Sequence, residues 1–212
     1  MNVAFLALTF LLFTGLCVLG SAVHWVACRL SRIPVHTITV FNGRPIATMS
    51  LGPTTIAFGY IPIGTSVTFD VPQFRSRPLA VRLAVLVSGP VALVLLAFVL
   101  LGWSNAMHHF LGGFTELYLG ALRPRTTALD LIGRLHAIFS SSTLAVFGVL
   151  AAKLAACSFL PIGSVTAAQL LQEVFRSYEQ GSWGARFAMV SALGTILLNI
   201  LWVLAGVLYA LR

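Results

Sequence analysis

The stretch LAVLVSGPVALVLLAFVLLGW, residues 83–103, contains no Asp, Glu, Lys or Arg, and it decides the fold class. A helix of about 20 apolar residues is what crosses the hydrocarbon core of a bilayer. Three other windows are comparably apolar, although one of them contains Lys153. We therefore predict an all-α polytopic membrane protein with about four transmembrane helices, over residues 1–30, 80–103, 139–160 and 187–211.

The composition of the whole chain agrees with this class. Its 212 residues are 58% hydrophobic and only 8% charged, and one water-soluble core cannot hide that much apolar surface. The same composition excludes a disordered chain, and three cysteines are too few for a disulfide framework. We expect a single membrane domain over residues 1–212, with the first apolar window retained as a span rather than cleaved as a signal peptide.

The net charge of +8 comes from twelve Arg and one Lys against five acids. The arginines flank the apolar runs, so they indicate membrane topology rather than nucleic-acid binding. The first connection between spans carries a net charge of +5, the second +1 and the third zero. By the positive-inside rule, the first connection is cytoplasmic, and with four spans both termini lie outside.

The first connection does not have the pattern of a long helix. Six of the nine prolines fall between Pro34 and Pro78, and the segment is rich in β-branched residues. Asn42-Gly43 predicts a hairpin that joins residues 37–41 to residues 45–51, and a second strand pair follows at 54–60 and 65–71. Because the segment has so few charges, we predict a re-entrant antiparallel β segment over residues 35–72 that dips into the membrane.

After the second span, residues 106–122 form an apolar, aromatic stretch that includes His108, His109 and Glu116. This pattern favours an interfacial helix.

Four short motifs occur one after another along these elements. They are HWVACRL (residues 24–30), IPIGTSV (61–67), SGPVAL (88–93) and SFLPIGSVTAAQ (158–169). The series resembles the site-2 protease family of intramembrane zinc metalloproteases. The structural positions that carry the resemblance are Arg29, Pro62, Gly64, Gly89, Pro90 and Pro161.

The residues at the family's catalytic positions do not match its chemistry. If His24 stands where the second zinc-ligand histidine would be, the first falls on Gly20 and the general-base glutamate on Ser21. The ligand aspartate falls on Thr166. Because catalytic zinc needs about three protein ligands and a carboxylate base, the resemblance implies a degenerate, inactive member that carries no cofactor.

Other side chains have competing interpretations. His24 and Cys28 share a helix face and could form a soft metal site with Cys157, although a buried histidine and apolar thiols are the simpler reading. Lys153 is an ionisable residue inside a predicted span, so it is a functional candidate, a snorkelling residue or a structural hydrogen-bond donor.

The remaining histidines carry no strong signal. Adjacent His108 and His109 chelate poorly, and His36 and His136 have no visible partner. Small residues after Ser140 suit close helix packing.

The function expected from these observations is a non-catalytic, membrane-embedded interaction protein, a pseudoprotease. It would act as a subunit or an assembly or regulatory factor of a hetero-oligomeric complex of integral membrane proteins. The resemblance favours a bacterial inner membrane. Two alternatives stay open: a divergent active zinc metalloprotease, and a small transporter or channel component.

Overall fold

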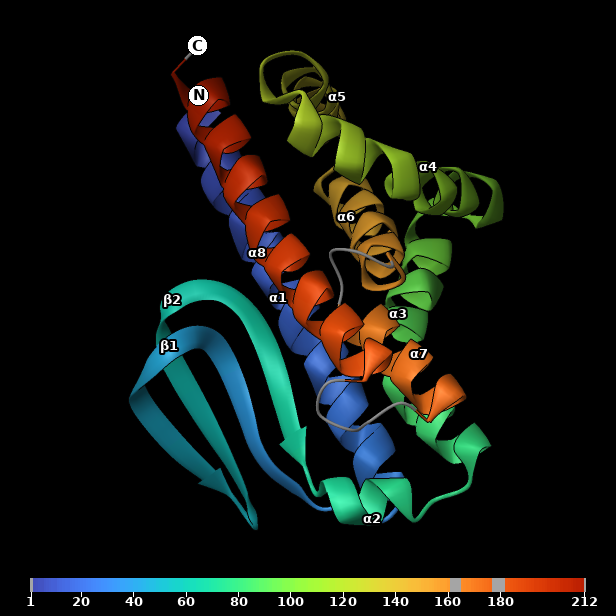
Figure 1. Ribbon diagram of the computed structural model, residues 1–212. Coiled ribbons are helices and arrows are strands. Elements are labelled where there is room, and N and C mark those ends of the chain that lie inside the picture. The colour runs from blue at the N-terminus through green and yellow to red at the C-terminus, as the bar shows by residue number, and fades with distance from the viewer. Residues whose placement is uncertain (1, 161–164, 177–181, 212) are drawn as a thin grey trace. The chain divides into compact units, whose positions relative to one another are not determined.

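The computed structural model describes residues 2–160, 165–176 and 182–211, and the chain is mostly helical (Figure 1). The elements in order are α1 (Asn2–Leu30), β1 (Val35–Leu51), β2 (Thr54–Phe69), α2 (Val71–Arg75), α3 (Leu79–Leu101), α4 (Trp103–Leu122), the π-helix η1 (Pro124–Ala128), α5 (Leu129–Ser141), α6 (Thr143–Ser158), α7 (Val165–Phe175) and α8 (Trp183–Ala210).

Among the residues that the structure describes, three helices are long and apolar enough to cross a membrane: α1 over Val3–Leu30, α3 and α8. They match three of the predicted spans, and the polytopic helical fold with a β segment between its first two spans is confirmed. The predicted span over residues 139–160 needs correction, because a break at Ser142 divides it between α5 and α6.

The physical reason for this break is a helix cap. Ser142 is extended, with φ −161° and ψ 115°, and its hydroxyl accepts the N–H of Ala145 at the start of α6. A serine in this position stabilises a new helix start rather than a continuous helix. The 16-residue α6 is therefore shorter than the other apolar helices.

The chain forms two compact units. Residues 14–92 form the first, which we call the sheet unit because it holds β1 and β2. Residues 1–13 and 93–212 form the second, the helical unit. The expectation of a single membrane domain stays a prediction.

The sheet consists of two long strands that both bend, so their halves pair separately. Residues 47–51 pair antiparallel with residues 54–58, and residues 37–40 pair antiparallel with residues 65–68. Residues 37–40 also lie beside residues 55–58, and there the paired residue numbers rise together from Thr37↔Thr55 to Val40↔Phe58. The segment at 37–40 is thus internal to the sheet, and the segment at 47–51 is an edge.

The hairpin predicted at Asn42-Gly43 is wrong. A two-residue type I′ turn needs positive φ at both central residues, whereas Phe41 and Gly43 have φ of 69° and 95° and Asn42 does not. The chain bends at this point, and Gly59 lies against the bend. Only glycine fits there, because a Cβ at this position would lie 2.3 Å from the Asn42 carbonyl oxygen. The tight turn lies instead at residues 52–53, between the paired residues Leu51 and Thr54.

In the helical unit, the first residues of α1 pack beside the last turns of α8. Phe5, Ala128, Ile132 and Ala205 form a buried cluster, against which Tyr209 also packs. The helix predicted over residues 106–122 is present as α4, and its interfacial position stays a prediction.

Candidate functional site

The α1 positions predicted to correspond to the family's catalytic residues, Gly20, Ser21 and His24, lie on one face of the helix and contact neighbouring segments of the sheet unit. The Ser21 hydroxyl donates a hydrogen bond to Thr65 Oγ1 at 2.7 Å, and Thr65 Oγ1 in turn donates to the Cys17 carbonyl oxygen at 3.2 Å. Thr65 follows Gly64, whose φ of +80° is a backbone conformation that favours glycine. The position that corresponds to the general base therefore ties α1 to β2.

His24 has structural partners in two elements. Its ring forms a hydrogen bond with the main chain of Val85 in α3, and its centroid lies 5.9 Å from that of Phe69 in β2. Cys28, one turn further along α1, is fully buried among apolar groups. These contacts favour the simpler reading of both residues, a bonded histidine and an apolar thiol.

Gly20 of α1 lies against Gly89 of α3. A Cβ added to Gly89 would lie 2.9 Å from the Gly20 carbonyl oxygen, so the two helices meet backbone to backbone at this level. His24, one turn after Gly20 on α1, contacts Val85, one turn before Gly89 on α3. Pro90, within α3, is buried at the same contact. The family-like Gly89 and Pro90 thus belong to the helix interface of the sheet unit.

The other family-like positions are scattered. Arg29 ends α1 in an exposed position, and its guanidinium carbon lies 5.5 Å from the centre of the Trp25 ring. Pro62 lies within β2, and Pro161 lies outside the described residues.

Thr166 belongs to α7 of the helical unit. It is half-buried, and Ala167 and Ala168 beside it are buried. The α7 helix is fastened to the start of α8, where Gln172 Nε2 donates to the Gly184 carbonyl oxygen at 3.0 Å. Glu173, which the sequence assigns to a connection, lies in α7 with only 6% of its surface exposed.

Lys153 has a partner that sequence reasoning missed. Its ammonium group forms an ion pair with Glu116 of α4, and both side chains are less than one third exposed. The contact is close because Gly113 lies one turn before Glu116, and a Cβ there would lie 2.8 Å from the Ala156 Cβ of α6. A usable signal exists: Glu116 is the one charge between Arg82 and Arg123, and Lys153 is the one charge between Arg134 and Glu173.

His109, also on α4, is close enough to Lys153 for the charge of the lysine to affect its pKa. Burial lowers its pKa, and the positive charge of Lys153 and the neighbouring His108 lower the pKa further.

His136 also has a partner, since its Nδ1 atom lies 2.7 Å from the Tyr209 hydroxyl and its ring stacks on Phe5.

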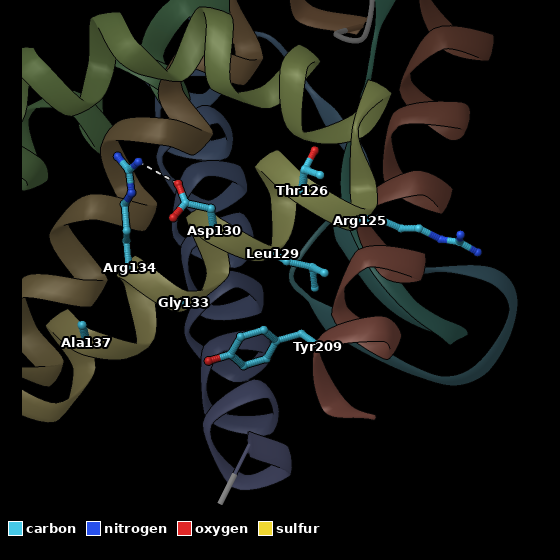
Figure 2. A pocket seen from close by; sticks show the side chains of 8 residues that line it. All are labelled: Arg125, Thr126, Leu129, Asp130, Gly133, Arg134, Ala137 and Tyr209. Atoms are coloured by element: carbon cyan, nitrogen blue, oxygen red, sulfur yellow. Dashed lines mark ion pairs between the residues drawn. The ribbon is translucent and has the colours of Figure 1, made fainter. Parts of the chain in front are cut away.

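A pocket of about 620 Å³ opens on the helical unit (Figure 2). Its lining residues are Arg125, Thr126, Leu129, Asp130, Gly133, Arg134, Ala137 and Tyr209. Figure 2 shows Arg134 turned toward Asp130, with which it pairs at 2.6 Å, and Arg125 pointing away from them. Both paired side chains are largely exposed, so the pair adds little stability. None of the predicted site residues lines this pocket.

Within the part of the chain that the structure describes, no three or more His, Cys, Asp and Glu side chains gather in a way that could hold a metal ion. The possible donors on this face of α1 are Cys17, Ser21, His24 and Cys28, of which Ser21 and His24 are engaged with protein groups. Because no three His, Cys, Asp or Glu side chains among the described residues meet at one point, these donors do not fit a catalytic zinc, which needs about three strong ligands.

Comparison with known proteins gives one match. Residues 8–202 match the sequence model of Peptidase family M50, a range that runs from α1 into α8. No curated protein matches the chain.

Proposed function

Because the chain belongs to peptidase family M50, the site-2 protease family, we propose that it is a non-catalytic member of that family which binds other integral membrane proteins. In this role it is a subunit or an assembly or regulatory factor of a larger hetero-oligomeric membrane complex. One observation carries the proposal: Gly20 and Ser21, on which the resemblance places the first ligand and the base, carry neither an imidazole nor a carboxylate.

The contacts of these residues support a structural use of that face. Ser21 binds Thr65 of β2, and His24 binds the main chain of Val85. Glycine supplies no ligand, and a neutral hydroxyl is a weak one. We derive no catalytic step from these residues, and we assign them to holding α1, α3 and β2 together.

The sheet offers a surface for a partner. Residues 47–51 of β1 pair on one side with β2, and the whole stretch 44–51 is exposed. Ile46 and Met49 on this edge are 73% and 54% exposed. An edge strand binds an extended segment through main-chain hydrogen bonds, and this mode of binding needs no metal.

The proposed setting is a bacterial inner membrane, with the first connection cytoplasmic and both termini outside. The support for the orientation is the charge of the connections, which is most positive in the first.

Metal content tests the proposal. We expect detergent-purified protein to contain less than about one tenth of a zinc ion per chain, for want of a ligand set. A His24→Ala variant is then expected to have the same metal content, and defined membrane proteins are expected to co-purify with both forms. Stoichiometric zinc in the wild type, lost in the variant, would refute a non-catalytic role.

One observation favours the alternative, a divergent protease. Glu173 is a buried carboxylate two turns after Thr166 on α7. If Glu173 served a metal centre, Glu173→Gln would abolish both bound zinc and cleavage of a membrane substrate. The interaction protein instead predicts that Glu173→Gln changes stability and leaves metal content unchanged.

A further inference from the structure

The spanning helix α8 carries an asparagine within the hydrocarbon core. The helix is unbroken over its 28 residues (Figure 1). A bilayer core takes up about 20 helical residues, and every window of that length in Trp183–Ala210 includes Asn199. Asn199 therefore lies at hydrocarbon depth in whichever register α8 crosses the membrane.

The carboxamide of Asn199 has hydrogen-bonding groups that the helix does not use. Its Nδ2 atom donates to the Thr195 carbonyl oxygen of the same helix at 2.8 Å. Within the described residues no other hydrogen bond involves this side chain, so its second N–H and its amide oxygen have no protein partner there. Because the hydrocarbon core offers no water, such groups are costly unless a neighbouring chain bonds them.

Asn199 belongs to an exposed face of α8. Ile196 and Val203, which are 58% and 53% exposed, lie about one turn before and one turn after it. Together with Gly206 they follow the spacing i, i+3, i+7, i+10, which is that of the seam between two paired helices. We call these four residues, Ile196, Asn199, Val203 and Gly206, the Asn199 face.

Gly206 leaves room for another helix on this face. No atom lies within 4 Å of the position that its Cβ would take, so the backbone of α8 is open there. Packing within the helical unit uses the adjoining side of α8, where Trp202 donates to the Leu117 carbonyl oxygen of α4 at 3.1 Å. A glycine near a polar residue lets two helix backbones come close enough for hydrogen bonds between them.

We propose that the Asn199 face is the interface between two copies of this chain, related by a two-fold axis along the membrane normal. Because all copies cross the membrane in the same orientation, such an axis brings Asn199 opposite the partner's Asn199 at the same depth. A carboxamide has both donors and an acceptor, so each of the two can donate to the oxygen of the other.

A second copy is favoured over a different protein for the same reason. A helix of another protein needs a polar group of its own at this depth, whereas a second copy has one by symmetry. The inference rests on α8 alone and does not depend on the loss of catalysis.

Fluorescence energy transfer between full chains in phosphatidylcholine vesicles tests the interface, because no other protein is present. Donor-labelled and acceptor-labelled chains are mixed over a range of protein-to-lipid ratios. We expect wild-type chains to associate, and Asn199→Leu to raise the protein mole fraction at half association about tenfold, for two lost hydrogen bonds. Asn199→Gln keeps the amide and should stay within about threefold of the wild type.

Two open glycines of spanning helices supply the matched control. Gly15 of α1, like Gly206, has no atom within 4 Å of its Cβ position, so a side chain can be added at either glycine. Gly206→Leu should prevent the close approach of two α8 helices and weaken association by about tenfold or more. Gly15→Leu should leave association within about twofold, because it lies outside the Asn199 face.

Three results would overturn the proposal. One is wild-type protein that stays monomeric at every ratio, and a second is equal association of the wild type and Asn199→Leu. The third is equal weakening by Gly206→Leu and Gly15→Leu. In the first case, a co-purifying membrane protein that is lost in Asn199→Leu would assign the face to that protein. If Asn199→Leu does not keep the wild-type unfolding midpoint, the comparison of the two glycine variants decides.

Discussion

At the scale of single residues, the ion pair between Lys153 and Glu116 is the sharpest test of the packing in the helical unit. Replacing Lys153 by Met leaves a partly buried carboxylate without its partner. Breaking a buried pair costs about 3–5 kcal/mol, and the partial exposure of these side chains places the expected loss nearer about 2 kcal/mol. Unfolding of the detergent-solubilised protein by sodium dodecyl sulfate measures this loss.

The matched control for this ion pair removes both charges. Lys153→Met/Glu116→Leu replaces the pair with apolar groups, and such replacements are often neutral or stabilising. We expect the double variant to recover to within about 1 kcal/mol of the wild type. A double variant as unstable as the single one would mean that the pair does not govern the contact between α4 and α6.

Two adjacent glycines of α4 give a second residue-scale prediction. A Cβ at Gly113 would lie 2.8 Å from the Ala156 Cβ, whereas at Gly112 its nearest neighbour would be 3.6 Å away. Gly113→Ala should therefore destabilise the protein by about 1–3 kcal/mol through overpacking. Gly112→Ala should be neutral or slightly stabilising, because alanine is the better helix former. Thermal unfolding of the two variants checks this, and equal midpoints would contradict the close approach of α4 and α6.

The contacts of single side chains mark the limit of what the sequence can predict. The polar positions of α1 follow from the motif, but their partners do not. His24 binds a main-chain group, and Ser21 binds a threonine 44 residues away, and neither leaves a periodic pattern in the sequence. The pairing of Lys153 with Glu116 could have been predicted, since each is the one charge in a long apolar stretch.

At the scale of elements, the strand segments were predictable and their pairing was not. Asn42-Gly43 is the strongest short hairpin signal in the chain, yet the turn lies at residues 52–53. Local turn preference was overridden by the bend at Phe41 and Gly43, which brings the first half of β1 beside both halves of β2. The predicted span over residues 139–160 begins too early for a similar reason, because apolar content alone does not register the cap at Ser142 that starts α6.

Cysteine cross-linking distinguishes the two pairings in a chain whose Cys17, Cys28 and Cys157 are replaced by Ala. Thr48 lies opposite Ala57 in the sheet, and directly paired strand residues have Cα atoms about 4.5–5.5 Å apart, within disulfide range. Thr48→Cys/Ala57→Cys should therefore cross-link readily under mild oxidation. Thr37→Cys/Thr48→Cys, the pair that a hairpin at Asn42-Gly43 would join, should not. The reverse result, read on a reducing and non-reducing gel, would restore the hairpin.

At the scale of the whole molecule, family membership follows from the order of weak motifs rather than from any one of them. The match over residues 8–202 spans the elements that carry all four motifs. The sequence could predict this because the apolar spans and the spacing of the landmarks carry the family pattern independently of the ligand positions. The surface that we propose for a partner, the exposed edge at residues 44–51, depends on how the strands pair, and the sequence did not predict that pairing.

The number of membrane crossings gives the last prediction. The rings of Phe5, near the start of α1, and Tyr209, near the end of α8, have centroids 6.3 Å apart, so we expect the two ends of the chain on the same side of the membrane. We therefore predict an even number of crossings, although among the described residues three helices are long enough by themselves. We predict that α6 makes the fourth crossing; its 16 residues span about 24 Å against a core of about 30 Å, so we expect the bilayer to thin beside it. Reporter fusions at each terminus should both be active outside, and a fusion within the first connection inside. Termini on opposite sides would show that α6 does not cross.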